Sequence, residues 1–490
     1  MKHKTLPFIF CCLCLLIASA PSIWSTRSAP AIGEFAEIDN YISSSMQQFN
    51  IPGVALAITQ GDEITHSKGF GTAGKGQSVT ADTPFYIGSQ SKSFTALAIM
   101  QLVEQNKLAL DAPVQTYIPW FKVADEQASK EITVRNLLQH TSGLSESGYM
   151  PKLPADATLE MLVRDIAHAR LAAPVGTKMQ YFNPGYSILG YLIETVSGQS
   201  YSDYLQSHIF EPLKMTNSFA DPAAAKEAGL AQGYSQMFML AVPLEQPVNE
   251  YDIPAGFIMA SANDMARFMM AMVNGGELDG VRVLSSENIQ LMFTPNIAIH
   301  SSYGFGWYIG TYHGVKSFTH GGATERFQTS VLILPEKKLT LVMLVNENHL
   351  IKGMTDLNTM FWNVADLLTG DPITTKEIPS LVYGWGFLLL LVFIIVSTVR
   401  KIIKMPQWRS KMLTWDTRRR WRDILQHLFM IAITVVIIAV IAPAFLQRGF
   451  SMKWFVGFLP DVAIVIGALI LEDMIQVIMK IWMIARCKTT

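Results

Sequence analysis

The sequence predicts a mixed α/β (α+β) fold, in which an antiparallel sheet is flanked by helices, a second lobe is helical, and transmembrane helices follow at the C-terminus. Three observations support this class. Strand-like runs separated by short turns lie near both ends of residues 30–371. The middle of that range carries apolar residues at helical spacing. Three long apolar segments occupy residues 378–490.

The first 25 residues have the layout of a signal peptide. A short basic stretch, Lys2–Lys4, precedes the apolar run Leu6–Ile17 and the small residues Ala18–Ala20. The alternative is a transmembrane anchor that stays attached, because Pro21 is a poor residue after a cleavage point.

Cysteine usage and charge exclude several classes of function. Cys11, Cys12 and Cys14 lie inside the predicted signal peptide and Cys487 is the fourth cysteine, so we expect no disulfide and no thiolate metal site in residues 30–371. The net charge of −1 argues against a nucleic-acid partner, because no basic surface is available to bind phosphates. We expect neither a metal nor a cofactor.

Three hairpins account for the predicted strands. The run "GVALAITQGDEITHSKGFG" turns at Gly61–Asp62, and "FQTSVLIL" and "LTLVMLVN" flank Pro335–Lys338. Two shorter strands in "FGWYIGTYHGVKSFTH" flank His313–Gly314. Strands from the two ends of residues 30–371 would pair into one sheet covered by helices.

The helical lobe is predicted from three segments. These are "ITVRNLLQHTSGL" (132–144), "PGYSILGYLIETVSG" (184–198) and "SANDMARFMMAMVNGG" (261–276), each with a glycine near its C-terminal end. A cleft between this lobe and the sheet is the expected place for a site.

The stretch "FYIGSQSKSFTALAIM" holds a candidate nucleophile. Ser89 and Lys92 are three residues apart at the start of an apolar helix, so they share one face. A serine in this place is often only a helix cap. A lysine in the first turn, however, opposes the helix macrodipole, and a desolvated lysine there loses its proton more readily and can act as a base.

Further blocks in the same order carry a family resemblance. They are "GSQSK" (88–92), "LLQHTSGL" (137–144), "QYFNPGYSILGYLIE" (180–194), "PAGFIMASANDMARF" (254–268) and "HGGATERF" (320–327). With these blocks, residues 30–371 resemble the serine β-lactamase and penicillin-binding protein superfamily, in its class C-like branch. That branch includes D-aminopeptidases, D-alanyl-D-alanine carboxypeptidases and esterases. The resemblance implies the β-lactamase/transpeptidase-like fold.

The resemblance also implies an acyl-enzyme mechanism. Ser89 would attack a carbonyl carbon while Lys92 and Tyr181 share the task of accepting its proton. Tyr181 would then activate the water that releases the acyl group, and Asn183 would bind the substrate amide or Lys92. The sequence has no G-x-S-x-G or H-E-x-x-H motif, which disfavours α/β-hydrolase and zinc-protease chemistry.

The strand motif "HGGA" would form the other side of the site. By the family pattern, the backbone N–H groups of Ser89 and Ala323 form the oxyanion hole. Gly321 and Gly322 would let the substrate lie close to this edge strand. His320 stands where efficient β-lactamases usually have a lysine that binds the substrate carboxylate, and a histidine is neutral or weakly charged near pH 7.

This departure favours peptidase or esterase substrates over β-lactams. Glu325 and Arg326 follow the motif closely, and two interpretations stay open for them: they line the site, or they form an ion pair at the surface.

The three apolar segments predict spans at 381–399, 428–446 and 455–475. The loop between the first two is rich in lysine and arginine: Arg400, Lys401, Lys404, Arg409, Lys411, Arg418, Arg419, Arg420 and Arg422. By the positive-inside rule this loop and the C-terminus are cytoplasmic. The catalytic domain is then outside the cytoplasmic membrane, in agreement with the signal peptide.

The third segment contains two acidic residues. Glu472 and Asp473 could be functional intramembrane acids, but we interpret them as the cytoplasmic end of the span, with residues 474–485 at the interface. We expect the spans to serve as an anchor in contact with lipid, and a homodimer formed through these helices is a further expectation. A class C-like domain followed by three spans is similar to membrane-bound prodrug-activating D-peptidases.

The sequence therefore predicts a multi-pass serine hydrolase of the cell membrane. Its expected substrates are D-amino-acid-containing peptides or cell-wall fragments, cleaved through a Ser89 acyl-enzyme. The alternatives are an esterase, a weak β-lactamase, or a penicillin-binding-like receptor that is acylated without turnover.

Overall fold

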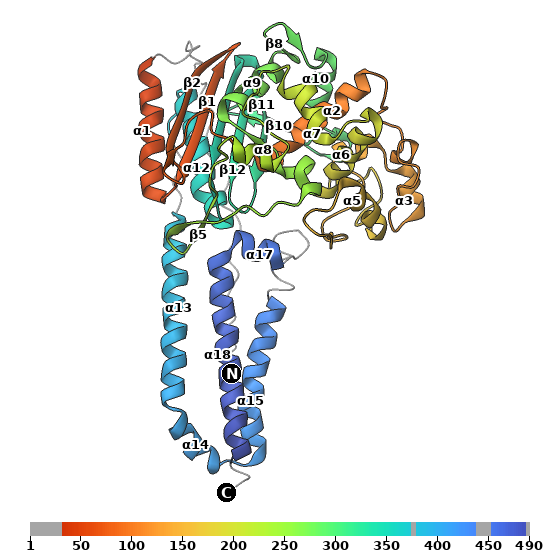
Figure 1. Cartoon of the computed structure of the whole chain (residues 1–490). Coiled ribbons are helices and arrows are strands. Elements are labelled where there is room, and N and C mark those ends of the chain that lie inside the picture. Colours follow the sequence, from red (N-terminus) through yellow and green to blue (C-terminus); the bar gives the residue numbers. More distant parts are fainter. Residues whose placement is uncertain (1–31, 374–378, 438–451, 487–490) are drawn as a thin grey trace, which may run out of the picture.

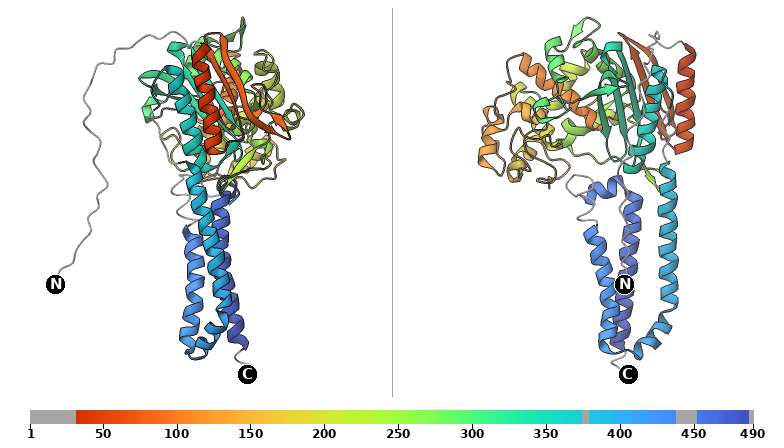
Figure 2. Two further views of the ribbon diagram at one scale, coloured as in Figure 1. Left: turned by 90° about the vertical axis from the view of Figure 1, so that its left-hand side faces the viewer. Right: turned by 180° about the vertical axis from the view of Figure 1, so that it is seen from behind.

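A computed structural model describes residues 32–373, 379–437 and 452–486. Residues 32–373 form a domain that stands on a bundle of long helices (Figures 1 and 2). The predicted signal peptide at residues 1–25 lies outside the described residues.

The domain is built on a seven-stranded antiparallel sheet with the order β10-β11-β12-β13-β1-β2-β3. Its strands are β1 (Gly53–Gln60), β2 (Glu63–Gly74), β3 (Gln77–Ser78), β10 (Tyr308–Tyr312), β11 (Val315–Ala323), β12 (Gln328–Leu334) and β13 (Leu339–Val345). The three predicted hairpins are β1–β2, β10–β11 and β12–β13, and all are confirmed. β1 pairs with β13 and so joins the two ends of the domain, with Leu56 opposite Met343.

Helices cover both faces of the sheet (Figure 1). α1 (Ile32–Phe49) and α12 (Asn358–Thr369) pack on one face, where Val54, Leu56 and Ile58 of β1 join their core. α2 (Ser91–Glu104) and α9 (Ala262–Val273) lie on the other side, in the core that contains Ala55 and Ala57. Because side chains alternate between the faces of a strand, β1 presents large residues to one layer and alanines to the other.

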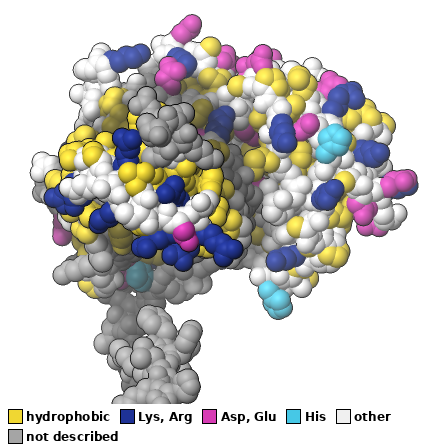
Figure 3. All heavy atoms as spheres, turned by 90° about the horizontal axis from the view of Figure 1, so that it is seen from below, with side chains coloured by type: hydrophobic (Ala, Val, Ile, Leu, Met, Phe, Trp, Pro, Cys, Tyr) yellow, Lys and Arg dark blue, Asp and Glu magenta, His cyan; other side chains and the backbone are white. Residues whose placement is uncertain are grey.

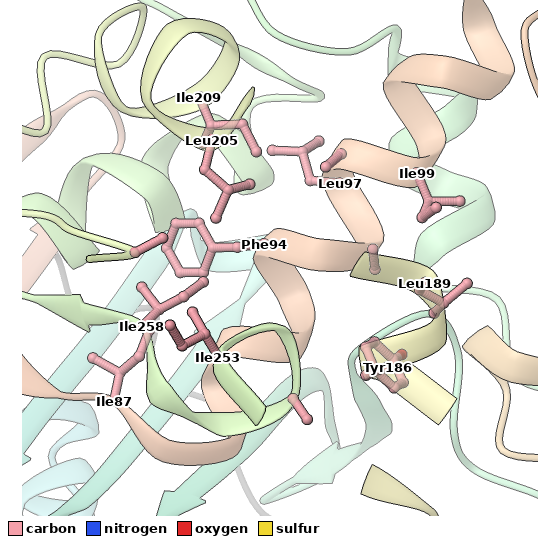
Figure 4. Close-up of a cluster of buried hydrophobic side chains, with 14 of the residues drawn as sticks. Ile87, Phe94, Leu97, Ile99, Tyr186, Leu189, Leu205, Ile209, Ile253 and Ile258 are labelled. Atoms are coloured by element: carbon pink, nitrogen blue, oxygen red, sulfur yellow. The ribbon is translucent and has the colours of Figure 1, made fainter. Parts of the chain in front are cut away.

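The helical lobe surrounds α2. Its helices are α3 (Glu126–Glu131), α4 (Val134–Leu138), α5 (Leu159–Asp165), α6 (Asn183–Ser197), α7 (Tyr201–Leu205), α8 (Pro222–Glu227) and α10 (Ser286–Met292). Phe94 of α2 stacks on Phe268 of α9 with 3.9 Å between ring centroids. Figure 4 shows Phe94 with Leu205 and Ile258 on either side. This packing fixes α2, the helix that follows Ser89.

One predicted helix is much shorter than expected. Of residues 132–144, only Val134–Leu138 is helical. A capping box of Thr133 and Asn136 starts this helix. The backbone leaves the helical direction at His140, which adopts a left-handed conformation with φ of 56°. The chain turns there and leaves His140 buried beside the site described below.

The bundle contains α13 (Ser380–Ile403), α14 (Met405–Leu413), α15 (Thr417–Val436), α17 (Met452–Phe458) and α18 (Pro460–Arg486). Within the described residues, two helices, Ser380–Ile403 and Pro460–Ala485, are long and apolar enough to cross a membrane. The predicted span 428–446 begins within α15, and its residues 438–446 lie outside the described part of the chain. Seen from below, lysine and arginine side chains gather at the far end of the bundle (Figure 3).

The third predicted span differs from the structure at both ends. The sequence predicts 455–475, whereas the structure has the short helix α17, then a new helix from Pro460 to Arg486. Pro460 has no N–H to continue α17, so it suits the first turn of a new helix. α18 continues past Glu472 and Asp473, whose carboxylates lie beside Lys401 of α13 and His427 of α15.

Candidate active site

Ser89 lies in a tight 3₁₀ turn, Gly88–Gln90, immediately before α2. The sequence predicts that Ser89 opens the helix, but the regular helix begins two residues later, at Ser91. The Ser91 hydroxyl donates to Gly88 O at 2.7 Å and accepts from the Ile258 N–H at 3.0 Å. These two hydrogen bonds hold the turn that presents Ser89.

Lys92 is fully buried behind Ser89, and its Nζ lies 3.2 Å from Ser89 Oγ. The same Nζ donates to Asn183 Oδ1 at 2.7 Å and to Ala255 O at 2.5 Å. A neutral amine has two N–H bonds and one lone pair. When Lys92 gives up a proton, its two remaining hydrogens can stay on Asn183 and Ala255, and its lone pair is then directed to the Ser89 hydroxyl.

Tyr181 lies over the same lysine, with its ring centroid 4.7 Å from Lys92 Nζ. Asn183 begins α6, and its amide nitrogen donates to Glu146 at 2.5 Å. Because the amide donates to Glu146, its oxygen is directed to Lys92. The structure thus brings together Ser89, Lys92, Tyr181 and Asn183, as the sequence predicts.

His140 supports Tyr181 from behind, with ring centroids 4.4 Å apart and the planes tilted by 33°. Its Nδ1 accepts from the Phe182 N–H at 3.2 Å. Burial, together with the charge of Lys92, holds the pKa of His140 well below its usual value. His140 is therefore neutral and positions Tyr181. Sequence reasoning did not single it out, although it lies in the family block at 137–144.

The end of β11 lies against the serine turn. A methyl group on Gly322 would collide with the Ile87 carbonyl oxygen, and one on Gly88 would collide with the Ala323 backbone nitrogen. Gly88 also has a φ of 54°, which favours glycine. These two glycines let the Ser89 turn and Ala323 lie side by side, as two oxyanion-hole donors require.

His320 is buried at the same strand end and carries no charge. Its exposed fraction is 2%. Burial, followed by the charge of Lys92, lowers the pKa of His320 to about 3. Nδ1–H donates to Gly321 O at 2.8 Å and Nε2 accepts from the Tyr303 hydroxyl at 3.1 Å. His320 therefore offers no positive charge to a substrate carboxylate.

These groups open into a cleft of about 1080 Å³. Ser89, Tyr181, Asn183 and residues 320–323 line it. Among the described residues that form its wall are three carboxylic acids, Glu146, Asp252 and Glu325, and no lysine or arginine. Burial raises the pKa of Asp252 to about 6.

The two charged residues after the strand motif have different places. Glu325 lines the cleft and accepts a hydrogen bond from the Gln246 side chain at 2.6 Å. Arg326 is not among the lining residues, and its guanidinium donates to Gly457 O of α17 at 2.9 Å. Within the described residues, no group of three or more His, Cys, Asp or Glu side chains is placed to hold a metal ion.

α17 also lines the cleft, through Trp454 and Phe458. Sequence reasoning did not predict this contribution, because "MKWFVGF" has no feature of a substrate-binding motif. Glu146 and Asp252 were likewise not predicted, since a lone acidic residue in a loop carries no distinguishing pattern.

A serine turn, a buried lysine and a glycine-rich strand edge in this arrangement define a serine hydrolase site of the β-lactamase type. The Beta-lactamase family model matches residues 38–361. The chain belongs to that family.

Several relatives in the family are named as penicillin-binding proteins. Penicillin-binding protein 4 of Amycolatopsis lactamdurans is 31% identical over 326 residues, covering 63% of this chain and 84% of that protein. The putative penicillin-binding protein PbpX of Bacillus subtilis is 34% identical over 296 residues, which is 58% of this chain and 71% of the relative. A solved structure, the octameric penicillin-binding protein homologue from Pyrococcus abyssi, is similar with a TM-score of 0.60 and 27% identity, covering 73% of this chain and 81% of that one.

Proposed function

We propose that the protein is a membrane-anchored serine peptidase or amidase that acts through a Ser89 acyl-enzyme outside the cytoplasmic membrane. The observation that carries the proposal is the pair of Ser89 Oγ and Lys92 Nζ, 3.2 Å apart, with the lysine fully buried. A serine hydroxyl is a weak nucleophile unless a base is adjacent to it.

In the proposed acylation step, Ser89 Oγ attacks the carbonyl carbon of the substrate. Its proton passes to Lys92 or Tyr181, and the N–H groups of Ser89 and Ala323 bind the developing oxyanion. The C–N bond then breaks, and the leaving amine takes up a proton from the same pair. In deacylation, Tyr181 accepts a proton from the attacking water, and Ser89 regains its hydroxyl.

The charges of the cleft support a substrate without a carboxylate beside the scissile bond. His320 is neutral, and the described lining residues include Glu146, Asp252 and Glu325 but no fixed cation. Peptides with D-amino acids, such as fragments of the cell wall, are the substrate class that we propose. An amide or ester group is sufficient for the chemistry.

Anchoring and orientation are part of the proposal. Two apolar helices of sufficient length follow the catalytic domain. The basic side chains of the loop between α13 and α15 favour a cytoplasmic location for that end of the bundle. The domain at the other end then faces the exterior.

The test uses the full chain in detergent and a fluorophosphonate probe. We expect wild type to be labelled and Ser89→Ala to be unlabelled. Ser43→Ala, on the outer helix α1, is the matched control and should be labelled like wild type. Persistent labelling of Ser89→Ala would end the assignment of the nucleophile.

The same preparations distinguish the substrate classes. We expect Ser89-dependent turnover of N-acyl-D-amino-acid amides and of p-nitrophenyl esters, and slow turnover of nitrocefin. Nitrocefin turnover at the rate of a dedicated β-lactamase would refute the peptidase proposal. Stable acylation without release of any product would instead indicate a receptor.

A further inference from the structure

The cleft has a wall that the catalytic domain does not supply. Trp454 and Phe458 of α17 line it together with Ser89 and His320. The two aromatic side chains stack on each other with centroids 5.0 Å apart and an interplanar angle of 27°. They lie one helical turn apart, so both side chains are on the same face of α17.

Contacts made by α17 and by the start of α18 hold this wall against the domain. Arg326 donates to the Gly457 carbonyl oxygen at 2.9 Å. Gly457 lies so close to Glu325 that a methyl group on it would displace that side chain. At the start of α18, Asp461 faces His349 of the domain at 3.0 Å, and each side chain is 1% exposed. α17 is therefore a fitted part of the site and continues directly into an apolar helix.

Both polar and apolar side chains line the cleft. Asn183, Glu146 and Asp252 surround the serine. The lining also includes the apolar residues Met150, Leu350, Ile351 and Met354 and the two aromatic residues of α17, beside which Glu325 lies. Met354 and Met150 are 66% and 40% exposed. Exposed apolar side chains that continue a binding cleft indicate a surface for an apolar ligand group.

We propose that Trp454 and Phe458 form an apolar subsite that determines specificity by binding an extended apolar chain of the substrate. This inference rests on the proposed function, because the chain belongs to the molecule whose carbonyl Ser89 attacks. The class of substrate is an amphiphile, with its scissile amide or ester at Ser89 and its apolar chain against Trp454 and Phe458. The position of α17 directly before the apolar helix α18 favours delivery of this chain from the membrane surface.

A series of p-nitrophenyl esters with acyl chains of two to eight carbons tests the subsite. The full chain is used at one fixed detergent concentration, with each ester below its micelle-forming concentration. A buried methylene contributes enough free energy for about a fourfold gain in kcat/KM, up to the length that the subsite accommodates. We expect this rise for wild type and a much flatter dependence for Trp454→Ala.

Two further variants separate a lost subsite from a damaged protein. Trp454→Phe keeps an apolar ring and should restore most of the dependence on chain length. Trp385→Ala removes a tryptophan that is 55% exposed on α13 and should behave as wild type. Labelling of Ser89 by a short fluorophosphonate reports an intact catalytic site in every variant.

The outcomes are distinct. If Ser89 is labelled but kcat/KM does not depend on chain length, the subsite is refuted and the proposed function stands. If Trp454→Ala lowers kcat/KM equally for short and long chains, α17 acts on the site in another way and the subsite is also refuted. If bound membrane lipid occupies the wall instead, adding phospholipid should abolish the chain-length dependence of wild type. If Ser89 is not labelled at all, the proposed function itself fails.

Discussion

Replacing Tyr181 by phenylalanine removes one oxygen atom and should leave the surroundings of the ring unchanged. The ring contacts His140 at 4.4 Å, Tyr303 at 6.4 Å and Lys92 at 4.7 Å, and each contact uses the aromatic ring. The cost in stability should therefore be that of one hydrogen bond at most, about 1 kcal/mol. The loss of a general base, in contrast, typically lowers the rate by about 10² to 10⁴, or roughly 3 to 5 kcal/mol in activation free energy.

The assay separates the two chemical steps. A burst of p-nitrophenol reports acylation of Ser89, and the following steady state reports release of the acyl group. We expect Tyr181→Phe to slow the steady state more than the burst, because Lys92 remains beside Ser89 in acylation. Tyr191→Phe on α6 is the matched control. A steady-state rate of Tyr181→Phe within about threefold of wild type would show that Lys92 suffices as the base.

Two further predictions concern topology and stability. Alkaline phosphatase fused after Asp371 should be active in cells and a fusion after Arg409 inactive; the reverse pattern would place the catalytic domain in the cytoplasm. Burial raises the pKa of Asp264 to about 6, so the folded protein binds the carboxyl proton more tightly than the unfolded chain does. The free energy of unfolding should therefore fall by at most about 3 kcal/mol as pH rises from 4 to above 6. Asp264→Asn keeps an oxygen that accepts from the Asn217 N–H and the Ser218 hydroxyl and should raise the thermal midpoint relative to wild type more at pH 7.5 than at pH 4.5. An equal difference in thermal midpoint between the two proteins at both pH values would contradict a buried charge on Asp264.

The hairpins were predictable because each is a local pattern. Alternating apolar residues and a short turn such as Gly61–Asp62 are sufficient to specify two paired strands. The pairing of β1 with β13 joins residues far apart in sequence. No local pattern indicates it, and it was expected only because both groups of strands pack most simply into one sheet covered by helices. The lysine in the first turn of α2 was informative because it contradicts the usual helix rule.

The supporting residues of the site could not be predicted in the same way. His140 matters because its backbone leaves the helical conformation and brings its ring under Tyr181, and the local pattern of residues 132–144 indicates a helix instead. Glu146 orients Asn183 across 37 positions of sequence. Trp454 and Phe458 reach the cleft because the whole bundle docks on the domain. Each depends on tertiary packing, which short motifs do not encode.

The electrostatics of the site connect its chemistry with its substrate. Three basic side chains at the site, Lys92, His140 and His320, are buried. Water cannot stabilise several charges there, and the charge of Lys92 further lowers the pKa of both histidines. The histidines therefore stay neutral and serve as hydrogen-bonding and packing groups.

A lysine in place of His320 would add a second buried cation to this group. It would have to displace the hydrogen bonds of His320 with Tyr303 and with Gly321, and it would either remain neutral or repel Lys92. A carboxylate-binding lysine at position 320 would thus require other partners for Tyr303 and Gly321. Because His320 is neutral, the proposed substrates are neutral where a β-lactam carries its carboxylate.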